Sequence, residues 1–335
     1  MQELRLAAIG SGMIVHAVLS HVKETPGVTL EAVYSRSRET GEALARECGC
    51  KKVYTSLEAM LLDPAVNTVY IASPNLLHFA QAKQALQAGK HVICEKPFVP
   101  TRAQAQTLIN LAKEKGLLLA EAVPTPHLPN FPLLRKLLPE IGPIRLVLAN
   151  YTQYSARYDK LRGGEKPNIF NPALAGGCLM DINFYNVYLN VALFGAPQSA
   201  AYYPNIYPGA ADTSGVFVMQ YASFISTNAG AKDARGKSFF TVEGERGSIE
   251  IENGANGLQR IHLLTAEKDE MLNEQPHPDR WYYEVCSLTK CFLDEDRETL
   301  DALLQTTLQT VTVMETARKN AGLRFPCDDS PQADG

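Results

Sequence analysis

The sequence lacks the features that would place the chain in a membrane or on a nucleic acid. No apolar run approaches the roughly 20 residues that span a bilayer. Lys and Arg number 32 against 36 Asp and Glu, a net charge of −4, so no basic surface for nucleic acid is indicated. The first residues lack the basic, apolar and small-residue order of a signal peptide, and we expect a cytoplasmic protein.

Cysteines are few and irregularly spaced. There are 7, an odd number, and none forms a CxxC pair or a zinc-ligand spacing. We interpret them as small buried side chains in a reducing compartment. His262 and His277 show no ligand spacing either, so we expect no metal site. Internal repeats and low-complexity segments are also lacking, and 335 residues are enough for two domains.

The first third of the chain alternates strand and helix signals. Short apolar runs predict strands at 4–9, 29–34, 68–72, 91–94 and 117–120. Thr101 with Gln104 indicates a capping box that opens a helix ending at Gly116. Strands that are apolar throughout are typical of burial on both faces, and alternating β and α elements favour right-handed βαβ units. We therefore predict an α/β fold whose first domain, residues 1–121, is a doubly wound parallel sheet.

The pattern changes after residue 122. Four prolines between 124 and 132 indicate a crossing segment, and alternating strands follow at 144–154 and 214–221. The segments 239–243 and 248–252 flank a Gly244–Gly247 turn, which predicts a hairpin. A long helix is predicted at 301–321, ended by Gly322. We predict that residues 122–335 form an α+β domain with a large, mostly antiparallel open sheet.

A glycine loop joins the first strand to the first helix in the stretch AIGSGMI, residues 8–14. Gly10 allows a tight turn, and Gly12 lets the backbone approach a pyrophosphate at the helix N-terminus, beside Met13 and Ile14. The third glycine of G-x-G-x-x-G is Val15 here. The position of the loop between a strand and a helix predicts a dinucleotide site rather than a plain turn.

The end of the second strand bears on which dinucleotide is bound. An acid there would bind the ribose 2′-hydroxyl, but the sequence has Ser35, Arg36 and Arg38. Two guanidinium groups can pair with a 2′-phosphate, which favours NADP, with NAD as the second choice. The alternative is that both arginines are ordinary solvated charges at the start of a helix.

Three ordered motifs connect the chain to a known family. They are SPNLLH at 73–78, AGKHVICEKP at 88–97 and GGCLMD at 176–181. In these motifs the chain resembles the Gfo/Idh/MocA oxidoreductases, from Leu4 to about Pro326. The resemblance implies a Rossmann domain followed by a domain whose sheet commonly pairs subunits, so a homodimer or homotetramer through the C-terminal sheet is expected.

The resemblance also assigns residues to roles. The family's catalytic lysine corresponds to Lys96. Cofactor-lining positions correspond to Ala72, Ser73, Pro74, Asn75 and His78, with Glu95 and Pro97 beside the lysine. The segment 176–185 corresponds to the family's GG…D-x-G-x-H pattern, with Asp181 kept, Asn183 for the glycine and Tyr185 for the histidine. The tyrosine resembles the branch containing dimeric dihydrodiol dehydrogenase and glucose–fructose oxidoreductase, although that branch's arginine near Pro126 is lacking here.

These residues suit proton transfer coupled to hydride transfer. A carbon that bears oxygen exchanges a proton when it exchanges a hydride, and a side chain must supply it in a closed cleft. Lys96 and Tyr185 can do so together, and the sequence does not rank them. Asp181, about one helical turn before Tyr185, can hold a substrate hydroxyl or orient Lys96. Pro97 is expected to hold Lys96 in an extended backbone conformation.

Each residue taken alone has a plainer interpretation. Glu95 and Lys96 can be a surface ion pair of little energetic value. Tyr185 can be a core aromatic with its hydroxyl bonded, and Asp181 can be a helix cap. Only their ordered combination indicates catalysis.

The sequence thus predicts an NAD(P)-dependent oxidoreductase acting on CH–OH groups. Its small-molecule substrate would be a polyol or carbonyl compound: a sugar, a cyclitol or a trans-dihydrodiol. Two alternatives stay open. One is a redox-neutral isomerase or hydrolase with tightly bound cofactor. The other is a non-catalytic dinucleotide-binding sensor.

Overall fold

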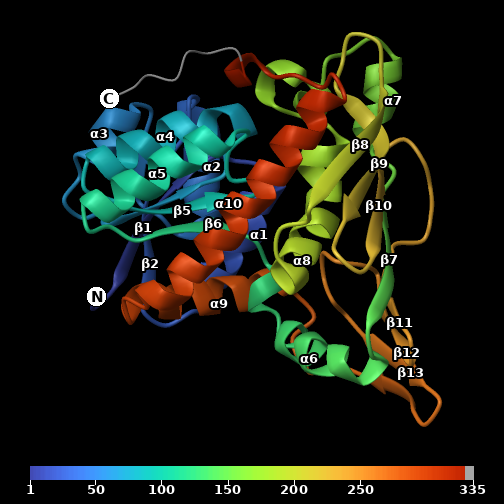
Figure 1. Cartoon of the computed structure of the whole chain (residues 1–335). Helices are drawn as coiled ribbons and strands as arrows, with labels where there is room; N and C mark the ends of the chain where they lie inside the picture. The colour runs from blue at the N-terminus through green and yellow to red at the C-terminus, as the bar shows by residue number, and fades with distance from the viewer. Residues whose placement is uncertain (329–335) are drawn as a thin grey trace. The chain divides into compact units, whose positions relative to one another are not determined.

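The computed structural model describes residues 1–328, which form two compact units (Figure 1). The first unit comprises Met1–Val123 and Trp281–Leu308, and the second comprises Pro124–Arg280 and the described residues from Gln309 to 328. The sequence pattern placed one boundary after residue 121. In the structure the first boundary follows residue 123. Residues 281–308 also belong to the first unit, and a single boundary in the sequence cannot describe this.

A parallel sheet of six strands forms the centre of the first unit, in the order β3-β2-β1-β4-β5-β6. The strands are β1 (Leu4–Ile9), β2 (Val28–Tyr34), β3 (Lys52–Tyr54), β4 (Thr68–Ile71), β5 (His91–Glu95) and β6 (Leu119–Ala122). The order runs outward in both directions from the neighbouring strands β1 and β4, and open sheets of this kind bind ligands beyond the carboxyl ends of the strands at that switch point. The predicted doubly wound parallel sheet is confirmed.

Helices connect these strands and cover the sheet. They are α1 (Met13–Val22), α2 (Arg38–Cys48), α3 (Leu57–Leu61), α4 (Asn75–Gln87) and α5 (Arg102–Glu114), joined later in the chain by α9 (Arg280–Leu293) and the first part of α10 (Arg297–Asn320). Thr101 caps α5 as predicted, because its hydroxyl accepts a hydrogen bond from the Gln104 N–H at 3.3 Å. The return half of the capping box is not formed, since the buried side-chain oxygen of Gln104 has no hydrogen-bond partner.

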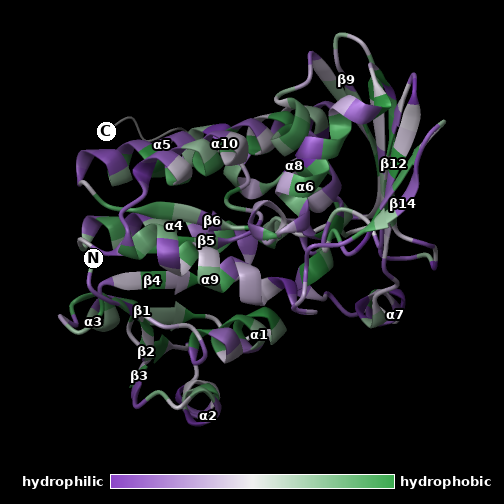
Figure 2. Ribbon diagram, turned by 90° about the horizontal axis from the view of Figure 1, so that it is seen from below, coloured by the Kyte–Doolittle hydropathy of each residue, from purple (hydrophilic) through white to green (hydrophobic). Residues whose placement is uncertain are grey.

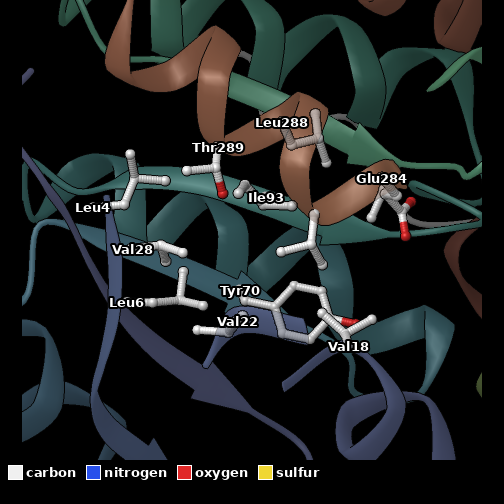
Figure 3. Close-up of a pocket in the computed structure, with 12 residues that line it drawn as sticks. Leu4, Leu6, Val18, Val22, Val28, Tyr70, Ile93, Glu284, Leu288 and Thr289 are labelled. Carbon is white, nitrogen blue, oxygen red and sulfur yellow. The ribbon is translucent and has the colours of Figure 1, made fainter. Parts of the chain in front are cut away.

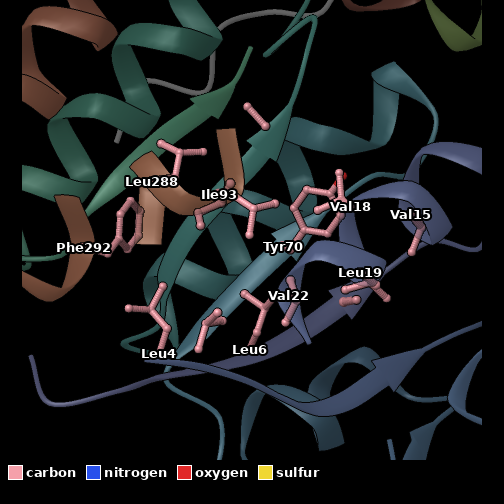
Figure 4. Packing of buried hydrophobic residues seen from close by; sticks show 14 of the residues in the cluster. Leu4, Leu6, Val15, Val18, Leu19, Val22, Tyr70, Ile93, Leu288 and Phe292 are labelled. Atoms are coloured by element: carbon pink, nitrogen blue, oxygen red, sulfur yellow. The ribbon is translucent and has the colours of Figure 1, made fainter. Parts of the chain in front are cut away.

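The core of the first unit lies between the sheet and helices α1 and α9 (Figure 4). It is built from Leu4, Leu6, Val18, Leu19, Val22, Tyr70, Ile93, Leu288 and Phe292. Strand residues of the opposite parity, such as Val69 and Val92, are fully buried as well, so the sheet is covered on both faces. Figure 2 shows the contrast between the largely hydrophobic β1 and the mixed, amphipathic α2. Burial on both faces explains why the strands are apolar throughout.

A mostly antiparallel sheet of eight strands forms the second unit, in the order β14-β13-β12-β11-β7-β10-β9-β8. The strands are β7 (Ile144–Thr152), β8 (Ser199–Ile206), β9 (Asp212–Gln220), β10 (Ile225–Ala231), β11 (Phe239–Gly244), β12 (Gly247–Glu252), β13 (Ile261–Thr265) and β14 (Asp269–Leu272). Only the β7–β10 pair is parallel among these strands. The predicted hairpin is confirmed, with Gly244 paired to Gly247.

Three α-helices lie wholly within the second unit over the described residues: α6 (Asn130–Leu137), α7 (Ala156–Arg162) and α8 (Phe184–Phe194). The last part of α10 belongs to it as well. Helix α8 packs against β7 and β10 and is preceded by a π-helical turn, Leu179–Asn183. Asp181 lies inside this π turn and Tyr185 follows it, so the two residues remain about one turn apart, although the turn is wider than that of an α-helix. Across residues 1–328, no helix combines the length and apolar character that a membrane crossing requires.

Candidate active site

The glycine loop after β1 has the backbone that the sequence predicts. Gly10 has φ of +116°, and a Cβ there would lie 2.4 Å from the carbonyl oxygen of Ala72, at the end of β4. Only glycine fits this approach without displacing backbone. A Cβ on Gly12 would meet no atom within 4 Å, so this glycine faces open space.

The first turn of α1 is open to an anion. Gly12 is the N-cap and provides no side-chain cap, and the first turn contains no acidic residue. The Met13 side chain is 77% exposed, Ile14 is half-buried, and Val15 is fully buried in the core where the third glycine would be. Unobstructed N–H groups at a helix N-terminus attract phosphate, so these residues fit the pyrophosphate of a dinucleotide.

The end of β2 carries exposed positive charge. Arg36 and Arg38 are both exposed, and Arg38 lies 3.5 Å from Glu42 in a weak surface pair. Ser35 is buried, and its hydroxyl accepts a 3.3 Å hydrogen bond from the Ser37 N–H. The end of β2 thus leaves positive charge exposed, and Arg36 takes no part in the Arg38–Glu42 pair.

The loop after β4 follows directly on the glycine loop. The Ala72 N–H donates to the carbonyl of Ile9 at 2.8 Å, which continues the β1–β4 ladder beyond the strand ends. The Ser73 hydroxyl donates to Gln81 at 2.7 Å. Pro74 is the N-cap of α4, which begins at Asn75.

His78 joins this loop to the segment after β5. Its Nε2 lies 2.8 Å from the Ser73 carbonyl, and its Nδ1 lies 3.1 Å from the carbonyls of both Pro97 and Phe98. The ring is 1% exposed, and burial lowers its pKa against the opposing effect of these carbonyls. The sequence placed His78 among the cofactor-lining residues; its contacts in the structure are with the two loops, which it ties together.

Lys96 and Glu95 are both buried, at 7% and 5% exposure. The interpretation of Glu95 and Lys96 as a surface ion pair is therefore wrong. Glu95 accepts a 2.7 Å hydrogen bond from the Tyr70 hydroxyl, whose pKa is raised well above its usual range by burial and by the charge of Glu95. The Lys96–Pro97 peptide bond is cis.

Three loops of the first unit thus lie side by side at the carboxyl-terminal end of the parallel sheet. β1, β4 and β5 are neighbours, and Gly10, Ser73 and Lys96 each follow the carboxyl end of one of these strands. Adjacent strands lie about 4.8 Å apart, so the phosphate loop and Lys96 are about 10 Å apart along the edge. A dinucleotide is long enough to reach from one to the other.

In the second unit, Tyr185 lies in an aromatic and cationic environment. It is 4% exposed, its ring centroid is 6.0 Å from that of Tyr151, and the Arg280 guanidinium lies 5.6 Å from its ring centroid. A cation over a phenol ring stabilises the phenolate relative to the phenol. Arg280 was not identified from the sequence, because it lies far along the chain and matches no motif.

Asp181 has a partner that sequence reasoning missed. Its carboxylate forms an ion pair with Lys232, which follows β10, and the Lys232 side chain is 4% exposed against 30% for Asp181. A nearly buried ammonium requires a compensating charge, and Asp181 supplies it. The pair leaves the outer part of the carboxylate accessible to solvent.

Asn183, which replaces the glycine of the family pattern, belongs to a buried amide network. Its Nδ2 donates to the Asn228 carbonyl at 3.0 Å, and its Oδ1 accepts from Asn186 at 3.0 Å. Glycine is found instead at position 230 of β10, where a Cβ would lie 2.7 Å from the Cβ of Asn183. The side chain missing at Gly230 makes room for the one present at Asn183.

A small cavity in the core of the first unit is separate from this edge of the sheet (Figure 3). Its volume is about 30 Å³, the share of one water molecule in the liquid. It is lined by Leu4, Leu6, Val18, Val22, Val28, Tyr70, Ile93, Ala122, Glu284, Val285, Leu288 and Thr289. The cavity is too small for a sugar and is not a substrate site.

Comparison with known proteins gives consistent matches over the chain. Residues 4–123 match the family profile described as an oxidoreductase family with an NAD-binding Rossmann fold, and residues 134–250 match the GFO/IDH/MocA C-terminal domain. The uncharacterized oxidoreductase YgjR of Escherichia coli is 36% identical over 97% of this chain and 98% of its own.

A second relative has a defined activity. The NADP(+)-dependent scyllo-inositol 2-dehydrogenase IolU of Bacillus subtilis is 33% identical over 98% of this chain and 100% of its own. Among solved structures, the 3-ketoreductase KijD10 of Actinomadura kijaniata, in complex with NADP and TDP-benzene, superposes with a TM-score of 0.83 at 21% identity. It covers 95% of this chain and 97% of its own, and this likeness concerns the fold.

Proposed function

This chain belongs to the Gfo/Idh/MocA family of NAD(P)-binding oxidoreductases, and from that membership we propose an NADP-dependent dehydrogenase or reductase acting on a sugar or cyclitol. The reacting group would be a secondary alcohol or its carbonyl. When bound, the nicotinamide supplies or accepts the hydride. The similarity to a scyllo-inositol 2-dehydrogenase favours a cyclitol among the candidate substrates.

The main support for this proposal is the position of Lys96. It is a buried lysine at the carboxyl end of β5, at the same sheet edge as an uncapped helix N-terminus and a glycine turn that admits no side chain. Open parallel sheets bind their ligands beyond the carboxyl ends of the strands, so a lysine buried there lies where a bound dinucleotide would reach. The lysine beside a dinucleotide loop is suited to carry the proton that accompanies hydride transfer.

Roles for the other residues follow from their surroundings. Tyr185, with the Arg280 cation over its ring, is proposed as the second group that handles the proton. Asp181 is proposed to accept a hydrogen bond from a substrate hydroxyl while Lys232 keeps it charged. Glu95 and Pro97, beside Lys96, are proposed to line the cofactor site as the motif predicts.

An assay of purified protein tests the proposed function. The protein is mixed with NADP⁺ and a panel of polyols that includes scyllo-inositol, myo-inositol, D-xylose and trans-dihydrobenzenediol, and absorbance at the NADPH band is followed. We expect reduction of NADP⁺ with at least one cyclitol or sugar. Tight cofactor binding with no absorbance change over the whole panel would count against the proposal and favour a redox-neutral enzyme or a sensor.

Arg36→Ala tests the preference for NADP. Loss of a charge-assisted contact of about 1.5–3 kcal/mol corresponds to a rise of about 10- to 100-fold in the Kd for NADPH. The Kd for NADH should stay unchanged, since NADH has no 2′-phosphate. Fluorescence titration of both cofactors measures the two constants.

Arg46→Ala is the matched control for Arg36→Ala. Arg46 is an exposed arginine in the last turn of α2, so its removal changes the net charge equally without touching the loop after β2. Equal effects of the two substitutions on NADPH binding would contradict a specific phosphate contact.

The second sheet offers a surface for self-association. Register places the exposed apolar side chains of Tyr203, Val216 and Ile225, at 65%, 40% and 44% exposure, on one face. Exposed apolar side chains gathered on one sheet face are typical of subunit interfaces. We expect light scattering to give a dimer or tetramer, and Val216→Glu on β9 to shift the mass toward the monomer. Ser248→Glu, on β12 of the same sheet, serves as a comparison.

A further inference from the structure

A second buried carboxyl group, to which the sequence motifs assign no role, lies beside Lys96. Glu121 on β6 is 5% exposed, and it is paired with Cys94 on the adjacent strand β5. Its Oε1 accepts a 2.8 Å hydrogen bond from the N–H of Phe98, two residues after Lys96. Its Oε2 accepts a 2.7 Å hydrogen bond from the hydroxyl of Thr307 on α10. The side chain therefore fixes the segment that follows Lys96.

The groups that face Glu121 come from three elements. β5 and the segment after it contribute Cys94, Glu95 and Lys96, and α10 contributes the neutral hydroxyl of Thr307. Burial, assisted by the charge of Glu95, raises the pKa of Glu121 to about 7, against the two hydrogen bonds and the charge of Lys96, which lower it. Burial, assisted by Glu121 and Glu95, also raises the pKa of the Cys94 thiol well above its usual range.

The hydrogen bonds of Glu121 are compatible with two protonation states. The Phe98 N–H is only a donor, so Oε1 accepts in both states. Thr307 can donate to a charged Oε2 or accept from a protonated one, because a hydroxyl does both. A proton can thus be gained or lost at Oε2 without loss of the anchor at Phe98.

We propose that Glu121 is a positioning residue for Lys96, and that gain or loss of its proton changes how strongly Lys96 is held in its charged form. The inference rests on the proposed function in assigning a proton-handling role to Lys96. Charged Glu121 places a carboxylate near the Lys96 ammonium and favours its charged form. When Glu121 is neutral, this favourable interaction is lost, and the lysine gives up its proton more readily.

Glu121→Gln isolates the charge from the geometry. The amide oxygen can still accept from Phe98, and the amide nitrogen can donate to Thr307, so the segment should keep its place. The free protein, labelled with ¹⁵N-phenylalanine and ¹³Cε-lysine, is titrated by NMR without cofactor or substrate. We expect the Phe98 amide to show an inflection near pH 7 in the unaltered protein and none in Glu121→Gln. The titration midpoint of Lys96 should fall by about one pH unit in the variant, the effect of one nearby charge.

Thr307→Val is a second variant, which should move the titration of Glu121 rather than abolish it. It removes a hydrogen bond that favours the charged form of Glu121 and leaves every charge in place. The Phe98 inflection should therefore move to higher pH. The pH profile of kcat/KM, where an active substrate has been found, should move to lower pH in Glu121→Gln.

The outcomes separate this inference from the proposed function. A Phe98 amide that does not titrate between pH 5 and 9, or titrates equally in Glu121→Gln, overturns the proposal. An unchanged Lys96 midpoint in Glu121→Gln overturns the coupling. If both NMR titrations behave as expected while no substrate is turned over, the coupling stands and the proposed oxidoreductase function fails.

Discussion

Replacing Lys96 with methionine should lower kcat/KM by about 10²- to 10⁴-fold, the range associated with loss of a general acid or base. Methionine keeps the length of the side chain and removes the proton that accompanies hydride transfer. The dissociation constant for NADPH should stay within about threefold, because the glycine loop after β1 remains intact and a single neutral substitution leaves its phosphate contacts unchanged. Steady-state kinetics and fluorescence titration measure the two effects.

Lys90→Met, at the other end of β5, is the matched control. Lys90 precedes β5 and is also buried, at 9% exposure, but its ammonium donates to the carbonyls of Asp63 and Val66 at 2.9 and 2.6 Å. Its removal leaves those two carbonyls without this donor, which should cost about 1–3 kcal/mol of stability and leave kcat/KM unchanged. Retention of kcat/KM by Lys96→Met, or an equal loss in both variants, would show that Lys96 is structural.

Residues that act through local backbone conformation were predictable from the sequence. The apolar run from Leu4 to Ile9 ends at Gly10, and both the strand bounds and the turn are as predicted. Thr101 likewise caps α5 at the predicted position. Such features depend on neighbours within a few residues, so a pattern of letters contains the information needed to predict them.

Residues that act across long sequence separations were not predictable in the same way. Lys232 reaches Asp181 from 51 residues away, and Thr307 reaches Glu121 from 186 residues away. No local rule connects such pairs, because tertiary packing brings them together. The family motif identified Lys96, but its burial beside Glu95 and Glu121 was visible only in the fold.

The π-helical turn before α8 illustrates a different limit. The sequence around Asp181 has ordinary helical composition, and 3.6-residue spacing was the natural assumption. The Leu179 N–H instead donates to Asp212 at 2.7 Å, a carboxyl group from β9 whose pKa is raised to about 6 by burial. The π-helical turn thus begins at a residue whose N–H is bonded to a distant strand, and helix propensity alone did not predict this turn.

Substitution of the two loop glycines should separate folding from cofactor binding. Gly10→Ala should destabilise the cofactor-free protein by about 2–4 kcal/mol, because a residue with a side chain is strained at φ of +116° and its Cβ would lie 2.4 Å from the Ala72 carbonyl. Gly12→Ala should cost less than about 1 kcal/mol, the difference between glycine and alanine at an N-cap, since its Cβ meets no atom within 4 Å. Chemical denaturation measures both changes.

Gly12→Ala, the less destabilising of the two substitutions, should nevertheless weaken cofactor binding. The open space at Gly12 is where the backbone would approach a pyrophosphate, so Gly12→Ala should raise the Kd for NADPH by about tenfold or more in a protein that is otherwise fully folded. Fluorescence titration of the folded variant reports this constant directly. Unaltered NADPH affinity in Gly12→Ala would mean that the nucleotide does not use the N-terminus of α1. The placement of the pyridine ring near Lys96, which depends on the phosphates being held there, would then lose its basis.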